Sequence, residues 1–291
     1  MRRVPVVMRP IGGVANRMFQ YMFCNVLANR IPGGYVCNVD LPEWSIPRVR
    51  PPFLWRYRTL RVSGYHRYDL DRITMAFNEG KARSVRFKGF AQRLGYYQRA
   101  EVAKLFNGRA IEAPAYGDDF LVINVRADEI LGGFHRNYCP MPFGFFETVI
   151  NESGRKPVFV GQIHDDNDYC RRLRQRFPDA AFAPKATPLM DFETLRRASH
   201  LVASVSSFSW LACWLSSAQT IHLPVAGIFD PHVRPDIDLL PFDDARYRFY
   251  QFDMGDWTGS LEQLASFYAD DIPFRQVRPS AVDDGGLKRL Q

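Results

Sequence analysis

Residues 120–129 read FLVINVRADE, an apolar run that ends in an arginine and two acids. The β-branched residues of its first part predict a buried strand at residues 120–125. The pattern downstream predicts further strands at residues 157–161, 200–205 and 220–225, and helices at residues 143–152, 168–177, 192–199 and 208–217. Strands that alternate with helices at this spacing indicate a parallel sheet covered on both faces, as in Rossmann-like domains.

The N-terminal part of the chain begins with a similar unit. The pattern predicts a strand at residues 4–9, a break at residues 10–13, a mostly apolar helix at residues 18–29 and a second strand at residues 35–39. Residues 41–72 lack a clear period, so we expect loops and short elements there. The chain is thus expected to be an α/β protein of two domains, residues 1–115 and 116–291, with a polar, disordered tail after Arg278.

Composition limits the class of protein. The first apolar stretch, residues 4–8, is too short for a signal peptide, and no later stretch reaches the roughly 18 apolar residues of a membrane span. Five cysteines without a Cys-x-x-Cys pair indicate neither a disulfide framework nor a zinc site. The net charge of +7 favours an anionic partner. We expect a cytoplasmic protein, with peripheral contact at the inner face of the membrane as a second expectation.

A first segment that suggests chemistry is the glycine pair Gly12-Gly13, between the first strand and its helix. Glycines at such a junction let backbone amides approach a ligand, and the N-terminus of a helix favours an anion. An ordinary turn also explains a glycine pair. In the same way, Asn16, Arg17 and Gln20 fit either a ligand site or cap and surface positions.

A second segment is Arg126-Ala127-Asp128-Glu129, directly after the strand at residues 120–125. Ligands of open α/β sheets bind beyond the carboxyl ends of the strands, where Arg126 is expected. An arginine there can bind a phosphate through two hydrogen bonds. The alternative is a structural ion pair between this arginine and one of the two carboxylates.

A third segment, SVSSFSW at residues 204–210, lies at a strand-to-helix junction. Hydroxyls and free amides in the first turn of a helix form a phosphate cradle, and they also form an ordinary N-cap. The preceding DFE at residues 191–193 is a capping signature for the helix expected at residues 192–199.

Together these three segments resemble the α-1,2-fucosyltransferases and, more distantly, the superfamily of fucosyltransferases that use GDP-fucose. That family opens with a strand followed by Gly-Gly-x-x-Asn-x-Met-Phe-Gln-Tyr, which residues 12–21 match at every specified position. Its late motif, a strand ending near Ser-Ser-Phe-Ser-Trp before an aromatic helix, is closely reproduced within residues 191–214. The resemblance covers most of residues 4–225.

The middle motif of that family, His-x-Arg-Arg-x-Asp, is matched only in part. Its phosphate arginine is kept as Arg126, but Asn124 replaces the histidine. Ala127 replaces the second arginine, and Glu129 replaces the final Asp. The resemblance implies the GT-B architecture, with two Rossmann-like domains facing each other across a cleft. It also implies an inverting, metal-independent transfer from GDP-fucose, with the donor bound mainly by the C-terminal domain and the acceptor on the N-terminal side.

The resemblance also assigns roles to particular residues. Arg126 would hold the donor diphosphate, Asp191 would lie near the ribose or base, and Asn16 would face the cleft from the N-terminal domain. Gln162, after the strand at residues 157–161, fits either a contact with the nucleotide or a strand-end cap. The residues expected to bind the donor are Gly13, Asn16, Arg126, Gln162, Asp191, Ser206, Ser207, Phe208 and Ser209.

An inverting transfer needs a base that accepts the proton of the acceptor hydroxyl. The candidates are Glu129, Asp128 and His135, although a neighbouring arginine lowers the pKa of a carboxyl and weakens it as a base. The acids of residues 165–168 resemble a metal-binding cluster, but they precede an expected helix, where acids favour the helix dipole. No metal site and no cofactor are therefore expected.

The expected partners are a nucleotide-sugar donor and a glycan or lipid-linked glycan acceptor. Arginine and aromatic residues between Arg48 and Arg72 favour an acceptor site or a membrane-facing surface over nucleic-acid binding, which the same composition also permits. Two alternatives share the motifs. One is a GT-B transferase with another nucleotide-sugar donor, and the other is a sugar- or nucleotide-binding relative without catalysis.

Overall fold

The computed structural model describes residues 3–53, 55–107 and 111–278, so the tail expected after Arg278 lies outside the described residues. The chain divides into two compact units, one of Met1–Ala110 with Asp236–Leu239 and one of Ile111–Pro235 with Leu240–Gln291. The first unit thus ends earlier than the expected division after residue 115, and it includes a short segment from the later part of the chain.

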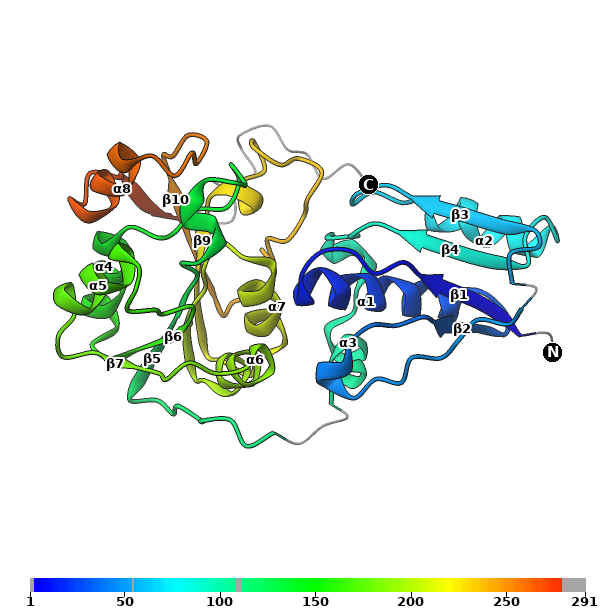
Figure 1. The fold of residues 1–291 in the computed structure, drawn as a ribbon, viewed down its shortest axis with the longest axis horizontal. Coiled ribbons are helices and arrows are strands. Elements are labelled where there is room, and N and C mark those ends of the chain that lie inside the picture. The colour runs from blue at the N-terminus through cyan, green and yellow to red at the C-terminus, as the bar shows by residue number, and fades with distance from the viewer. Residues whose placement is uncertain (1–2, 54, 108–110, 279–291) are drawn as a thin grey trace. The chain divides into compact units, whose positions relative to one another are not determined.

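The first unit contains a four-stranded parallel sheet in the order β2-β1-β4-β3 (Figure 1). Its strands and helices are β1 (Val4–Met8), α1 (Val14–Arg30), β2 (Gly34–Cys37), β3 (Thr59–Ser63), α2 (Leu70–Asn78), β4 (Ser84–Lys88) and α3 (Arg99–Leu105). The helix α1 packs on the sheet, where the ring centroids of Phe23 and Phe87 lie 4.8 Å apart. This contact identifies the face of β4 that carries Phe87 as the face covered by α1.

The second unit contains a seven-stranded sheet in the order β11-β10-β9-β8-β5-β6-β7, in which only β11 is antiparallel to its neighbour. Its elements are β5 (Phe120–Val125), α4 (Phe143–Ser153), β6 (Lys156–Gly161), α5 (Asp168–Arg176), β7 (Ala181–Phe182), α6 (Pro188–Arg197), β8 (His200–Val202), α7 (Ser207–Leu215), β9 (Thr220–Val225), β10 (Tyr247–Phe252), α8 (Leu261–Tyr268) and β11 (Phe274–Val277). Helices α4, α5 and α8 cover one face of this sheet, and α6 and α7 cover the other (Figure 1). The expected α/β class with parallel sheets is confirmed in both units.

Residues 41–72, where we expected loops and short elements, include the five-residue edge strand β3, whose exposed Arg61 and Ser63 interrupt the apolar pattern. One expected helix boundary was wrong for a local reason. The helix expected at residues 192–199 begins at Pro188, because Thr187 caps it by accepting a hydrogen bond from the Met190 amide. Asp191 therefore lies inside the first turn of α6.

None of the described helices is both long and apolar enough to cross a bilayer.

Candidate functional site

The candidate site lies at the carboxyl edge of the seven-stranded sheet. Strands β8, β5 and β6 are neighbours in this sheet and run parallel. Arg126 directly follows β5, Gln162 directly follows β6, and residues 204–206 connect β8 to α7. Because the carboxyl ends of parallel strands share one edge, these three loops lie next to one another.

Arg126 joins two of these loops. Its Nη1 donates a hydrogen bond of 3.0 Å to Ser206 Oγ, and its Nη2 forms an ion pair with Glu129. The guanidinium lies 5.0 Å from the ring centroid of Tyr138. Its Nε is buried and has no hydrogen-bond partner among the described residues. The structural ion pair that the sequence suggested as an alternative is thus present, between Arg126 and Glu129. The same guanidinium also reaches Ser206 at the start of α7.

The first turn of α7 has the N-cap that the sequence left as one of two alternatives. Ser206 is the N-cap residue, and its Oγ accepts a hydrogen bond of 3.2 Å from the Phe208 amide. The side chain of Ser207 forms a hydrogen bond with the hydroxyl of Tyr138. Ser209 is fully buried, and its Oγ accepts a hydrogen bond of 3.1 Å from the Ser204 amide, so it stabilises the turn from inside.

Gln162 holds the loop after β5 in place. Its Oε1 accepts hydrogen bonds from the amides of Ala127 at 3.1 Å and Asp128 at 3.3 Å. Its Nε2 donates to Glu129 Oε2 at 3.3 Å. Asp128 in turn lies 3.0 Å from His164 Nε2. The structure therefore brings Gln162 and both acids of the RADE segment into one cluster with Arg126.

Asn124, which stands where the resembled family has a histidine, is a buried structural link. Its Nδ2 donates to the carbonyl of Val160 in β6 at 3.2 Å. Its Oδ1 accepts a hydrogen bond of 2.7 Å from Ser204 Oγ. The residue thereby connects β5 to β6 and to the turn after β8, which fixes the positions of the loops that carry Arg126 and Ser206.

The ionisation of the acids distinguishes their roles. Burial raises the pKa of Glu129, but the charge and the hydrogen bond of Arg126 together lower it by more. The pKa of Glu129 is therefore below its usual value. Burial raises the pKa of Asp191 to about 6. Among the described residues, the Asp191 carboxylate has no hydrogen-bond or ion-pair partner. Because α6 leads back to the start of β8, its first turn lies at the same carboxyl edge of the sheet as Arg126.

Tyr138 and Arg234 are site residues that the sequence reasoning missed. Burial raises the pKa of Tyr138, and the charges of Arg126 and Arg234 act on the same hydroxyl. Both residues lie outside helices and strands, where no periodic pattern marks them. His135 is exposed, and its ring centroid lies 5.9 Å from that of Tyr138, which places it beside the cluster.

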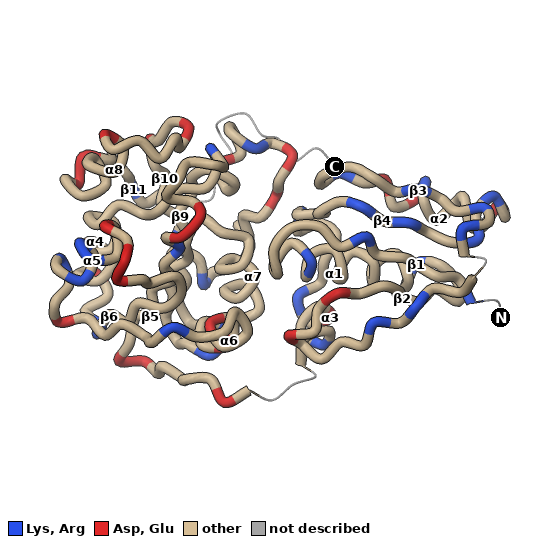
Figure 2. Tube along the Cα trace, in the orientation of Figure 1, with Lys and Arg blue, Asp and Glu red and all other residues tan. Residues whose placement is uncertain are grey.

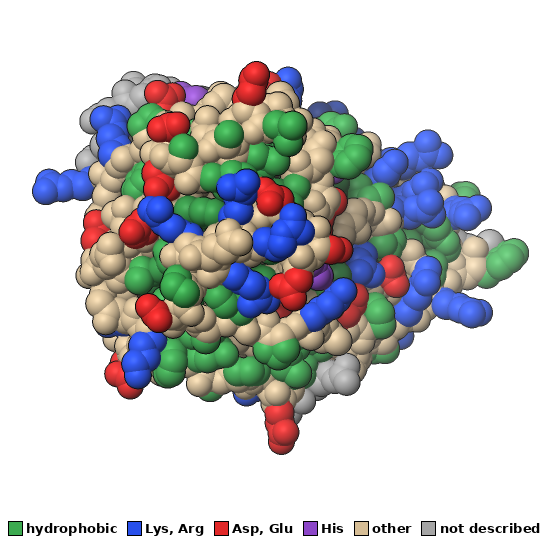
Figure 3. Space-filling view, turned by 60° about the vertical axis from the view of Figure 1, so that its left-hand side comes forward, with side chains coloured by type: hydrophobic (Ala, Val, Ile, Leu, Met, Phe, Trp, Pro, Cys, Tyr) green, Lys and Arg blue, Asp and Glu red, His purple; other side chains and the backbone are tan. Residues whose placement is uncertain are grey.

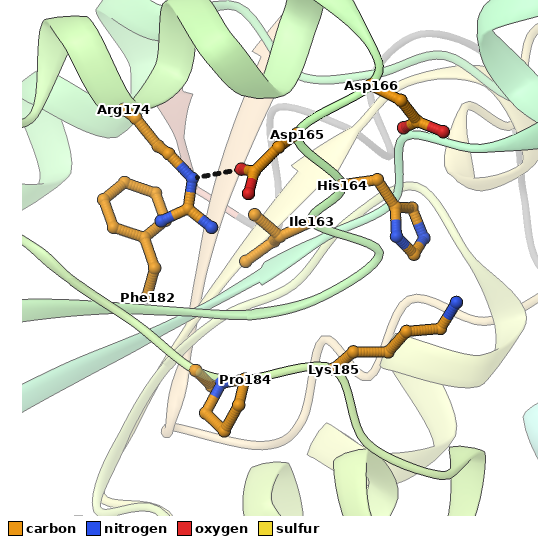
Figure 4. A pocket seen from close by; sticks show the side chains of 9 residues that line it. Ile163, His164, Asp165, Asp166, Arg174, Phe182, Pro184 and Lys185 are labelled. Carbon is orange, nitrogen blue, oxygen red and sulfur yellow. Dashed lines mark hydrogen bonds and ion pairs between the residues drawn. The ribbon is translucent and has the colours of Figure 1, made fainter.

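A pocket of about 510 Å³ adjoins this cluster. It lies between residues 163–166, which follow β6, and residues 182–185, which follow β7. His164 lines the pocket and also pairs with Asp128, so it connects the pocket to the cluster. Figure 4 shows Lys185 extending towards His164, while Asp165 pairs with Arg174 on the other side. The volume is within the range of small-molecule sites.

Two of the three acids in residues 165–168 pair with cations. Asp165 accepts a hydrogen bond of 2.9 Å from Arg174 Nε, and Asp168 accepts one of 2.7 Å from Arg172 Nε. Asn167, between them, is the N-cap of α5. Within the described ranges, no three His, Cys, Asp or Glu side chains lie close enough together to hold a metal ion.

Gly13 and Asn16 belong to the first unit, at the carboxyl end of β1. Gly13 is the N-cap residue of α1, and a Cβ atom there would meet no atom within 4 Å. Gly12 has a φ of +75°, and a Cβ atom there would lie 2.6 Å from Asn16 Nδ2. Asn16 Oδ1 accepts a hydrogen bond of 3.0 Å from Gln92 Nε2. Close packing thus explains the first glycine, while the space beside the second is open.

Gln20 and Arg17 have structural roles in the same segment. Gln20 is buried and bonds to both polar groups of the Ile11 backbone, at 3.1 Å to the amide and 2.7 Å to the carbonyl. Arg17 pairs with Asp40 and Glu43, each at 3.1 Å. Both side chains are thus held by partners in this unit, and Gln20 is a buried residue rather than the cap or surface residue of the second interpretation.

Comparison with known proteins agrees with the resemblance seen in the sequence. Residues 145–233 match the model of glycosyl transferase family 11. None of the curated proteins matches the chain. A mutant of Arabidopsis thaliana FUT1 in complex with GDP is 12% identical with a TM-score of 0.45, over 76% of this chain and 70% of that chain. The E. coli heptosyltransferase WaaC with ADP is 13% identical with a TM-score of 0.48, over 92% of this chain and 97% of that chain.

Both structural likenesses are too low in identity and TM-score to assign an activity or a ligand to the present chain. The family match is the stronger finding, because it includes α6, β8 and α7 and therefore Asp191, Ser206 and Ser207. It supports a glycosyltransferase. Over residues 145–233 the chain is similar to glycosyl transferase family 11, as the motifs of the sequence predicted.

Proposed function

We propose that the chain transfers fucose from GDP-fucose to a hydroxyl of a glycan acceptor, with inversion at the anomeric carbon. The observation that supports this most directly is the bond between Arg126 and Ser206 at the N-terminus of α7. A fixed guanidinium beside the N-terminus of a helix is suited to a diphosphate. The match to glycosyl transferase family 11 over residues 145–233 supports the fucosyl type of donor.

In the proposed reaction the acceptor oxygen attacks the anomeric carbon of fucose. The bond between that carbon and the diphosphate oxygen breaks, and GDP leaves with the bonding electrons. Arg126, the amides of the first turn of α7 and the nearby Arg234 would stabilise the charge that develops on the diphosphate. These positive groups can do so without a metal ion, so we expect a chelator to leave the activity unchanged.

The acceptor proton must pass to a base, and the three candidates differ in their surroundings. Glu129 is paired with Arg126, and Asp128 is paired with His164. His135 is exposed beside Tyr138. We propose that the donor diphosphate replaces Glu129 as the partner of Arg126. The carboxylate released in this exchange would then be free to accept the proton, since loss of the arginine partner raises its pKa.

We further propose that the pocket beside His164 accommodates the nucleoside. The amino group of Lys185 and the carboxylates of Asp165 and Asp166 supply polar contacts there. Asp191, without a partner of its own among the described residues, would accept hydrogen bonds from ribose hydroxyls or from guanine N–H groups. A carboxylate prefers guanine to uracil or thymine for this purpose, because guanine presents adjacent N–H donors.

The donor assignment is tested by calorimetric titration with GDP, UDP, CMP and dTDP. We expect GDP to bind most tightly, and equal affinities for all four nucleotides would contradict a guanine site. The activity itself is tested by turnover of GDP-fucose with and without a glycan acceptor. A non-catalytic relative, the alternative suggested by Asn124 and Ala127, would bind GDP but neither transfer nor hydrolyse the donor.

A further inference from the structure

The two units carry charges of opposite sign. The first unit has 20 Lys and Arg residues against eight Asp and Glu residues, a net charge of +12. The second has 18 against 23, a net charge of −5. Basic residues follow one another along β3 and β4 and the segments beside them in Figure 2. Such an asymmetry within one chain indicates that the first unit meets an anionic surface.

Part of this charge lies on one face of the four-stranded sheet. Phe87 of β4 packs against Phe23 of α1, so its neighbours in the strand, Arg86 and Lys88, point to the opposite face. Arg61 of the edge strand β3 is the direct cross-strand partner of Arg86. Two arginines and a lysine thus share the face of β3 and β4 that α1 does not cover.

This arrangement is unfavourable in the protein alone. Like charges directly opposite each other on neighbouring strands destabilise a sheet. Among the described residues, Arg61, Arg86 and Lys88 form no ion pair or hydrogen bond through their side chains, whereas Arg30 and Arg93 of the same unit pair with carboxylates. A negatively charged partner would remove the repulsion.

An aromatic loop lies against the same face. The side chains of Thr59 and Ser84, which are cross-strand partners on this face, both donate hydrogen bonds to the carbonyl of Trp55. The loop thus anchored exposes the rings of Phe53, at 96%, and Tyr57, at 64%. Arg83 lies over the Tyr57 ring, 5.7 Å from its centroid. Figure 3 shows Lys and Arg side chains gathered around hydrophobic ones over the part of the molecule at the right, which is the first unit in Figure 1.

We propose that this basic face, formed by Arg61, Arg86 and Lys88 with residues 50–53 and 55–58, binds a membrane that contains anionic lipids. The cations would lie at the headgroups, and Phe53 and Tyr57 would enter the interface between headgroups and acyl chains. A lipid surface fits better than a nucleic acid, because Phe53 projects freely rather than forming part of a flat stacking platform. The surface lies in the first unit, so its binding does not depend on the proposed donor site.

The test is co-flotation of the full chain with vesicles, in the absence of donor and acceptor. We expect binding to vesicles of phosphatidylcholine with phosphatidylglycerol, weaker binding at high salt, and little binding to phosphatidylcholine alone. The double variant Arg61→Ala/Arg86→Ala should partition about 30-fold more weakly, at the usual contribution of a basic residue near an anionic surface. Phe53→Ser should weaken partitioning about tenfold through loss of its apolar contact.

Matched controls remove the same chemistry from the second unit. Lys156→Ala/Arg275→Ala removes two cations that have no ion pair among the described residues, and Leu261→Ser removes a side chain that is 84% exposed. Both should bind vesicles like the parent protein. The Arg61→Ala/Arg86→Ala variant should also melt at the same or a higher temperature, because the cross-strand repulsion is gone.

Three results would overturn the proposal. The first is equal binding to neutral and anionic vesicles, and the second is equal loss of binding in the matched controls. The third is tight binding of single-stranded RNA, lost in Arg61→Ala/Arg86→Ala, without binding to vesicles. A protein that binds GDP and transfers fucose but fails these tests would refute the membrane surface alone.

Discussion

Glu129 occupies the position next to Arg126 that a donor diphosphate is proposed to take. The pair is partly exposed, with 23% of the arginine side chain and 48% of the glutamate side chain accessible. Ion pairs of this exposure contribute little to stability, about 1 kcal/mol or less. The ion pair is therefore weak enough for a phosphate to replace Glu129. Breaking the pair should still lower the affinity for the donor.

We predict that Glu129→Gln binds GDP more tightly than the parent protein. The substitution removes a negative charge and a competitor for Arg126, so we expect the Kd measured by calorimetry to fall about fivefold, which corresponds to about 1 kcal/mol. If Glu129 is also the base, kcat falls in the same variant. Unchanged or weaker GDP binding would contradict the proposed exchange.

Asp191 is a second residue whose environment suggests a ligand. Its pKa of about 6, raised from 3.8 by burial, means that ionisation above pH 6 destabilises the folded state. The favourable contribution of the protonated form is thus lost as the pH rises through 6. A group that stays unpaired at this cost suggests selection for a partner other than the protein itself.

We predict that Asp191→Asn is more stable than the parent protein at pH 8, by about 2 kcal/mol after allowance for partial exposure. The stability difference should shrink below pH 6. The same variant should bind GDP more weakly, since the amide cannot replace a charged acceptor. Thermal melts at pH 5 and pH 8 with calorimetry on the same sample check both effects, and a destabilised variant at pH 8 would refute this account.

At the level of elements, the sequence predicted the strands of the second unit best. Residues 120–125 and 220–225 form β5 and β9 with the expected bounds, because their β-branched and apolar residues fill buried strands. Strand β3 could not be seen in the same way, because this edge strand exposes Arg61 and Ser63, two of its five residues. Strands β10 and β11 and helix α8 were not predicted. In β10, Arg248 and Gln251 interrupt the aromatic residues, which breaks the apolar run that would mark a buried strand.

The amino edge of the seven-stranded sheet leads to a prediction about acid stability. His222 of β9 is buried, its Nδ1 lies 2.9 Å from the Tyr250 hydroxyl, and burial together with the charge of Arg248 lowers its pKa to about 4. Burial also lowers the pKa of His200 in β8. Between pH 6.5 and 4 the unfolded chain binds protons that the folded protein does not, so stability falls as the pH falls.

We expect the His222 contribution to reach about 3 kcal/mol at pH 4. His222→Gln, which can keep a hydrogen bond to Tyr250, should show a flatter loss of unfolding free energy over this range than the parent protein. Urea titrations at a series of pH values measure the difference. An unchanged slope would mean that His222 does not titrate as its burial requires.

At the level of the whole molecule, the sequence predicted which loops carry the site but not all of its members. The carboxyl-edge rule brings Arg126 and Ser206 together although 80 residues separate them, because β8 and β5 are neighbours in the sheet. Tyr138 could not be found in this way, because no strand or helix contains it. Residues Asp236–Leu239 belong to the first unit because of tertiary contacts such as the ion pair between Arg93 and Asp238. A local sequence pattern cannot predict such contacts.

Arg126 is proposed to stabilise the leaving diphosphate, and one comparison of variants tests this role most directly. We propose to measure kcat and melting temperature on the same preparations of the parent protein, Arg126→Lys and Arg126→Ala. Lysine keeps the positive charge but cannot form the paired hydrogen bonds of a guanidinium, and alanine loses both the charge and these hydrogen bonds. We predict that kcat falls about a hundredfold or more in each variant, with alanine the more severe, on the scale of a removed oxyanion donor. The melting temperature should change little, because the pair with Glu129 is partly exposed. Near-normal kcat in Arg126→Ala, together with a lower melting temperature, would contradict the account and leave the arginine a structural ion pair.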